Sequence, residues 1–170
     1  MEIAITPLNL RLYGDPCLRK KSTPVKSVKT GERMLIQSMI ATMHKHKGIG
    51  LAAPQVGINE QIFVVDVGQG PFAVINPRIL KRKGNAILEE GCLSVPGVLV
   101  HVKRPQTIVV QYLDENNNVV EREYTDLLAR VFQHETDHLN GRLILDYARW
   151  GEKRKIRKQL DKILQENNVA

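Results

Sequence analysis

The stretch His-Glu-Thr-Asp-His at residues 134–138 decides how the fold is interpreted, because it sets two imidazoles four residues apart. Leu127 and Val131 precede it at the same spacing of three to four residues, which predicts a helix with His134 and His138 on its inward face. Four residues turn a helix by about 400°, so the two rings stand one turn apart on the same side. They can therefore bind one metal ion together.

Glu135 follows the first histidine and would lie beside the metal rather than on it, where a general acid or base is needed. A catalytic site of this kind takes three protein ligands and leaves one position open. The continuation His-x-x-Gly-x-x-His of one protease class fits at Gly141 but fails at Ile144. The best remaining third ligand is Cys92, a thiolate donor that follows the strand-like residues 86–89.

Helices are predicted on both sides of the middle of the chain. Apolar residues at three- and four-residue steps predict one helix over residues 32–47, ended by Gly48, and a last helix over about 152–167. The motif helix is expected to begin at Thr125 or Asp126, either of which can cap it. A short helix is also predicted where Asp15 precedes a proline.

The middle of the chain has strand periodicity instead. Apolar runs and alternation predict strands over residues 62–67, 98–102, 108–112 and 119–124, with an asparagine turn at 116–118. The expected fold class is therefore α+β, with antiparallel sheets packed around the central motif helix and a further helix at the carboxy end. A length of 170 residues predicts a single catalytic domain over 1–170.

Composition places the chain among globular cytoplasmic proteins. Hydrophobic residues make up 42% and no run of 18 apolar residues occurs, which argues against a membrane span. Two cysteines, Cys17 and Cys92, are too few for a disulfide framework, and no secretory leader is recognisable. The net charge is +7, and residues 149–162 carry seven basic against two acidic side chains. Such a basic helix can follow a phosphate backbone or simply face solvent.

These features are compatible with three hypotheses, which assign different functions to the metal site. In the first, a hydrolase uses the His2Cys site with an open position. A zinc peptidase with the same helix would need a different third ligand, and none is apparent downstream. A basic RNA-binding protein could keep the metal as a structural staple, but such a site is closed by four protein ligands. Taken alone, the two histidines could also lie on the surface of an amphipathic helix, and Cys92 could be buried and inert.

The sequence resembles the peptide deformylases, metallohydrolases that remove the formyl group from the amino-terminal methionine of new proteins. The likeness rests on three motifs in order. They are Gly-Ile-Gly-Leu-Ala-Ala-Pro-Gln-Val-Gly at 48–57, Glu-Gly-Cys-Leu-Ser at 90–94, and Gln-His-Glu-Thr-Asp-His-Leu at 133–139. The likeness extends from Tyr13 to the terminal helix. One departure is Leu99, where some deformylases carry an arginine near the substrate backbone.

The resemblance implies that Cys92, His134 and His138 bind one divalent metal ion and that Glu135 is the catalytic acid/base. Ferrous iron is the implied native ion, with Zn²⁺, Ni²⁺ or Co²⁺ as substitutes; thiolate and imidazole ligands suit both iron and zinc. Gln55 would point its amide at the substrate carbonyl, and the backbone N–H of Leu93 would help to receive negative charge.

The resemblance also implies where the substrate lies. The expected substrate-binding residues, including an apolar pocket for the methionine side chain, are Ile49, Gly50, Leu51, Leu88, Gly91, Leu127 and Val131. The expected partners are the nascent formyl-methionyl chain and, through the basic terminal helix, the ribosome; neither a membrane nor DNA is expected as a partner.

Overall fold

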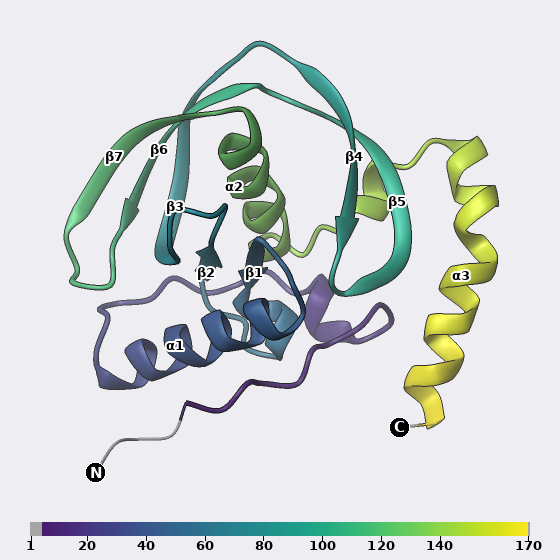
Figure 1. Cartoon of the computed structure of the whole chain (residues 1–170), viewed down its shortest axis with the longest axis horizontal. Helices are drawn as coiled ribbons and strands as arrows, with labels where there is room; N and C mark the ends of the chain where they lie inside the picture. Colours follow the sequence, from purple (N-terminus) through teal and green to yellow (C-terminus); the bar gives the residue numbers. More distant parts are fainter. Residues whose placement is uncertain (1–4, 170) are drawn as a thin grey trace.

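The computed structural model describes residues 5–169 (Figure 1). The helices are α1 (Thr30–Lys45), α2 (Asp126–Leu139) and α3 (Trp150–Val169), with short 3-10 helices at Pro16–Arg19, Ala53–Val56 and Ile144–Tyr147. The strands are β1 (Gly50–Ala52), β2 (Ile62–Val65), β3 (Phe72–Lys83), β4 (Ala86–Cys92), β5 (Val95–Arg104), β6 (Thr107–Leu113) and β7 (Val119–Thr125).

The strands form two separate antiparallel sheets. Five of them pair in the order β1-β2-β3-β6-β7, while β4 and β5 pair only with each other. In Figure 1, α2 lies in the middle of the molecule between the two sheets, and α3 lies at the edge next to β5. The predicted α+β class with antiparallel sheets around the motif helix is therefore confirmed.

Helix α2 is held by an aromatic cluster on the five-stranded sheet. Phe132 is fully buried, with its ring centroid 4.6 Å from that of Tyr124 and 5.1 Å from that of Phe63. The hydroxyl groups of Tyr112 and Tyr124 form a hydrogen bond of 2.9 Å inside this cluster. Burying a large aromatic side chain of this kind stabilises a fold by roughly 1.5–3 kcal/mol. Phe132 thus anchors the helix two residues before the histidine motif.

Two further apolar clusters complete the core. Helix α1 buries Ile36, Met39 and Met43 against the inner side of β1 and β2. The two-stranded sheet buries alternate residues of β5, among them Val100, against the segment after α2 and against Ile163 of α3. The β4–β5 pair and α3 therefore share one cluster, while α2 packs in another.

Most predicted elements are confirmed, with two main differences. The long strand β3 was not expected, because Pro77 interrupts the apolar alternation of this segment. In the structure, Asn76 before this proline has a positive φ of 51°. Its register with β6 is irregular at the same place. Neither Thr125 nor Asp126 caps α2 with its side chain. The backbone N–H of Asp126 instead donates to the carbonyl of Gln106 at 2.8 Å.

The prediction of a short helix after Asp15 is confirmed, since its carboxylate accepts a hydrogen bond from the N–H of Cys17 at 2.9 Å. The turn at 116–118 is confirmed by the left-handed backbone of Asn117. None of the helices within residues 5–169 is both long and apolar enough to cross a membrane.

Candidate active site

The end of β4 and the inward face of α2 bring Cys92, His134 and His138 together. The Sγ of Cys92 lies 3.3 Å from Nε2 of His138, and that nitrogen lies 3.2 Å from Nε2 of His134. One potential ligand atom from each residue lies within 4.8 Å of the others. Within residues 5–169 no fourth cysteine, histidine or carboxylate joins this group. The arrangement is that of a three-ligand site with one open position.

The charges around this group favour a cation. Burial lowers the pKa of His138 well below its usual value, so its ring is neutral and ready to donate a lone pair. Burial also opposes charge on His134, yet hydrogen bonds to Cys92 and Glu90 outweigh it and raise the pKa of His134 well above its usual value. Cys92 and Glu90 thus favour positive charge at His134, and a divalent ion that replaced the ring proton at Nε2 would supply it. The residues present fit a bound metal.

Glu90 orients His134 from the side away from Cys92. Its Oε2 lies 3.1 Å from Nδ1 of His134, which leaves Nε2 of that ring for the metal. Arg104 donates to both oxygens of Glu90 at 2.7 and 3.0 Å. Burial raises the pKa of Glu90, but the hydrogen bonds from His134 and Arg104 outweigh burial and lower that pKa to about 2. Glu90 is therefore ionised at neutral pH and can accept the hydrogen bond that orients His134.

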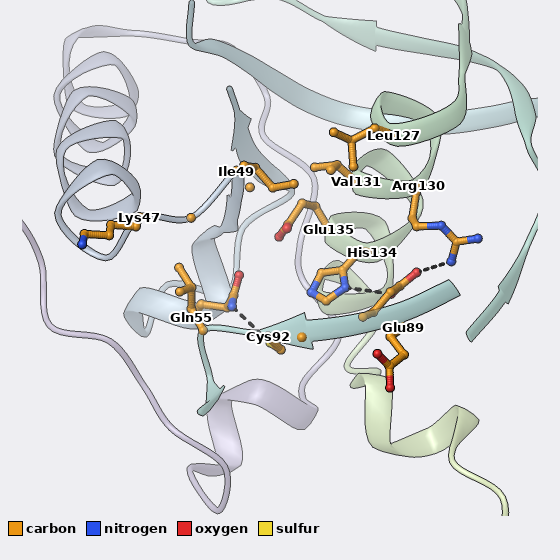
Figure 2. A pocket seen from close by; sticks show the side chains of 15 residues that line it. Lys47, Ile49, Gln55, Glu89, Cys92, Leu127, Arg130, Val131, His134 and Glu135 are labelled. Carbon is orange, nitrogen blue, oxygen red and sulfur yellow. Dashed lines mark hydrogen bonds and ion pairs between the residues drawn. The ribbon is translucent and has the colours of Figure 1, made fainter. Parts of the chain in front are cut away.

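Glu135 points into the same space from α2 (Figure 2). It is 3% exposed, and its Oε2 has no hydrogen-bond partner among the described residues. Burial raises the pKa of Glu135 to about 7, close to the value that suits proton transfer at neutral pH. The Glu135 carboxylate can lie this close to β1 only because residue 50 is glycine, since a Cβ atom there would collide with it.

Gln55 faces the group from the short helix after β1. Its Oε1 accepts a hydrogen bond from the N–H of Ala52 at 2.9 Å, which turns its amide NH₂ toward the metal site. That NH₂ lies 3.6 Å from the Sγ of Cys92 and 3.2 Å from the Oγ of Ser94. Gln55 is 1% exposed, so its orientation is held by packing as well.

A cavity of about 490 Å³ opens over these residues. Its wall includes seven residues expected to contact substrate or to receive negative charge: Ile49, Gly50, Gln55, Gly91, Leu93, Leu127 and Val131. It also includes Lys47, Glu89 and Arg130, which sequence reasoning missed. Arg130 could have been found, because it precedes His134 by four residues and therefore lies on the same helix face.

Two residues expected at the substrate site lie outside this cavity wall. Leu51 is fully buried against α1, because successive side chains of β1 point to opposite sides and Gly50 faces the site. Leu88 is 54% exposed and pairs with Val102. It stands four residues before Cys92, which is about 13 Å along a strand. Its part in the methionine pocket therefore stays a prediction.

The family model of polypeptide deformylase matches residues 7–154. The chain belongs to the polypeptide deformylase family. It is 47% identical over 152 residues to a peptide deformylase of Thermotoga neapolitana, covering 89% of this chain and 93% of the relative. A peptide deformylase of Chlorobaculum parvum is 45% identical over 168 residues, covering 95% and 89% respectively.

Solved deformylase structures have the same fold. The peptide deformylase of Legionella pneumophila superposes with a TM-score of 0.90 at 33% identity, covering 97% of this chain and 99% of that one. The peptide deformylase of Ehrlichia chaffeensis, in complex with actinonin, has a TM-score of 0.88 at 38% identity, covering 95% and 98%. This deformylase is accordingly a hydrolase that removes the N-formyl group from nascent peptides.

Proposed function

We propose that this deformylase hydrolyses the formyl amide at a metal centre held by Cys92, His134 and His138. The convergence of these three ligand atoms within 4.8 Å carries the proposal. A divalent ion bound there acts as a Lewis acid and lowers the pKa of water. Ferrous iron is the proposed native ion, with zinc, nickel or cobalt as substitutes, since thiolate and imidazole suit all of them.

Glu135 is the proposed acid/base. As a carboxylate it accepts the proton of the attacking water, and as a carboxylic acid it returns that proton to the amine as the C–N bond breaks. Formate and a free amino terminus are the products. Support comes from the burial of Glu135, its unpartnered Oε2 and its pKa of about 7.

Gln55 and the backbone N–H of Leu93 are proposed to receive the negative charge that develops on the formyl oxygen. The anchored amide of Gln55 supports this role, because its NH₂ is already directed at the site and needs no reorganisation. Losing one such donor typically costs about 2.7–4 kcal/mol of transition-state stabilisation.

The substrate is proposed to lie along Ile49 and Gly50 on one side and Gly91 on the other, with its methionine side chain against Leu127 and Val131. All five residues are in the cavity wall. Leu127 is 53% exposed, so a bound methionine would cover apolar surface that now faces solvent.

Release of formate tests this function. Enzyme reloaded with nickel or cobalt should release formate from formyl-Met-Ala-Ser, lose that activity with a strong chelator and regain it with the ion. An acetyl-Met peptide of the same length serves as the control and should be cleaved much more slowly, because its methyl group makes the acyl carbon less electrophilic and more hindered than a formyl carbon. Cleavage of internal peptide bonds without formate release would contradict the proposal.

We further propose that residues 1–170 act as one catalytic domain in the cytoplasm and that α3 docks on the ribosome. Helix α3 packs Ile163 into the core, while Arg154, Arg157 and Lys158 are exposed. Reversing these three charges to Glu should leave turnover of a short formyl-Met peptide unchanged and abolish salt-sensitive cosedimentation with ribosomes. Cosedimentation that survives the reversal would mean that α3 only packs.

A further inference from the structure

The proposed metal ligands come from two parts of the molecule that pack into different apolar clusters. Cys92 ends β4, and the β4–β5 sheet is buried together with the segment after α2 and with α3. His134 and His138 lie on α2, whose apolar side is buried on the five-stranded sheet. The two sheets share no strand pairing within the described residues. The distance from the thiolate to the imidazoles therefore depends on what joins α2 to β4 and β5.

Arg130 spans this joint with three hydrogen bonds. Its Nη1 donates to Oε1 of Glu90 at 2.6 Å and to the carbonyl of Val102 at 3.0 Å. Its Nη2 donates to the carbonyl of Ala86 at 2.8 Å. Figure 2 shows Arg130 extending away from α2 toward this sheet. All three acceptors belong to β4 or β5, whereas the Cα of Arg130 lies on α2, one turn before His134.

The three hydrogen bonds of Arg130 fix the position of its guanidinium and do more than place a positive charge near Glu90. A guanidinium is planar and directs its donors in a fixed fork, so contacts with three acceptors fix its place relative to both strands. Arg130 is 8% exposed, and so its donors have little competition from water. Arg104 makes another connection across the joint, through its contact with Asp137 at 2.8 Å, and Glu90 reaches His134 at 3.1 Å. The helix is thus tied to the sheet both before His134 and beside His138.

Arg130 is not needed to balance the charge of Glu90, because Arg104 already does so. Arg104 lies on β5, so its two hydrogen bonds to Glu90 stay within the two-stranded sheet. Without Arg130, Glu90 would remain paired with Arg104 and hydrogen-bonded to His134. The carboxylate would keep its charge and its histidine, but the helix would lose its ties to the carbonyls of Ala86 and Val102.

We propose that Arg130 is a positioning residue that holds the imidazoles of α2 at the right distance from the Cys92 thiolate and so determines how tightly the metal is bound. This inference rests on the metal ligands of the proposed function. Replacing a residue that directly contacts a metal ligand typically lowers metal affinity by about 10- to 100-fold. Arg130 contacts Glu90, which in turn contacts His134, and it also fixes α2 on the sheet, so we expect Arg130→Met to fall in the same range.

The test measures metal binding apart from turnover. Nickel affinity is measured by competition with a chelator, the thiolate-to-cobalt charge-transfer band of the cobalt form is recorded, and unfolding of the metal-free protein is followed. Arg130→Met should bind nickel about 10- to 100-fold more weakly and shift or weaken the band. Arg130→Lys should be intermediate, because an ammonium keeps the charge but lacks the planar fork.

Tyr124→Phe is the matched control, because it removes the buried Tyr112–Tyr124 hydrogen bond from the cluster under α2 without touching the joint. It should lower stability while keeping wild-type nickel affinity. Wild-type affinity and an unchanged band in Arg130→Met would overturn the proposal. If Arg130→Met does not fold, Arg130→Lys decides by the same comparison. A wild-type protein without any thiolate band would instead contradict the proposed ligand set.

Discussion

Replacing Gly50 by alanine is a sharp perturbation of the site, because an added Cβ would collide with the carboxylate of Glu135, the proposed acid/base. A Cβ at this position would collide with the Oε1 of Glu135 and would lie 2.8 Å from a methyl group of Val131. Gly50 is not one of the glycines with positive φ, so alanine brings no backbone strain of its own. The substitution therefore reports on contact alone.

The expected magnitude follows from these contacts. Carbon atoms pack at about 3.5–4.0 Å, so the new methyl group and its neighbours must separate by about 1 Å. The Glu135 carboxylate is the end of a flexible side chain and can rotate away, which limits the loss of stability to about 1–3 kcal/mol. A displacement of about 1 Å at the reacting groups can reduce the rate by about 10²-fold, or about 2.7 kcal/mol in the barrier.

The assay is kcat/KM for formate release from a formyl-Met peptide, with metal content measured on the same sample. Gly50→Ala should lose about 10²-fold in kcat/KM while keeping its metal, because the atoms nearest to the new Cβ belong to Glu135 and Val131 and not to a metal ligand. Gly31→Ala on α1 is the matched control, since a Cβ there meets no atom within 4 Å. It should keep full activity. Wild-type kcat/KM in Gly50→Ala would refute the idea that Glu135 acts from its observed position.

Three further predictions concern single side chains. Glu135→Gln should retain one metal per chain and lose about 10²- to 10⁴-fold in kcat, since it keeps the shape of the side chain but cannot carry the proton; loss of metal would make Glu135 structural instead. Iron-loaded enzyme should decay in air faster than the nickel form, and Cys17→Ser should not protect it. Burial raises the pKa of the Cys17 thiol to about 12 and so suppresses its reactive thiolate; protection by this change would place the damage at Cys17. Glu152→Gln should destabilise α3 only where Glu152 is ionised. Hydrogen bonds from the N–H groups of Arg149 and His101 and from the His101 ring lower the pKa of Glu152 to about 2. Because the folded pKa is depressed, this stabilisation is complete above the usual pKa of 4.5 and is lost as the pH falls toward about 2. Urea unfolding across this range should show the difference between wild type and variant shrinking, and a difference independent of pH would contradict the assignment.

Local periodicity explains why the helices were predictable from the sequence. The apolar stripe of α2 contains Leu127 and Val131 at helical spacing, and the histidines continue it, so His134 and His138 had to share a face. The strands β5 and β6 alternate regularly and were predicted for the same reason, whereas β7 was predicted as the strand that returns after the asparagine turn. These signals need only neighbours in the chain.

The contacts between distant segments could not be derived in this way. Cys92 lies more than 40 residues from His134, and its approach depends on packing of two sheets whose separation no periodic pattern reveals. Similarly, Glu90 and Arg130 carry no local signal that one accepts from the other. The part of Leu88 in the methionine pocket stays a prediction, because alternation predicts a side of the strand but not how far the cavity extends along it. The motifs of the family resemblance indicated that Cys92 lies beside the two histidines, which local sequence patterns cannot predict.

X-ray absorption of the zinc-loaded enzyme tests the ligand set most directly. One sulfur at about 2.3 Å and two imidazole nitrogens at about 2.0–2.1 Å should surround the ion, with an oxygen donor in the remaining position. Cys92→Ser should remove the sulfur contribution, whereas Cys17→Ser should leave it unchanged. A wild-type spectrum without sulfur, or one with four protein ligands and no oxygen donor, would contradict a catalytic centre built from Cys92, His134 and His138.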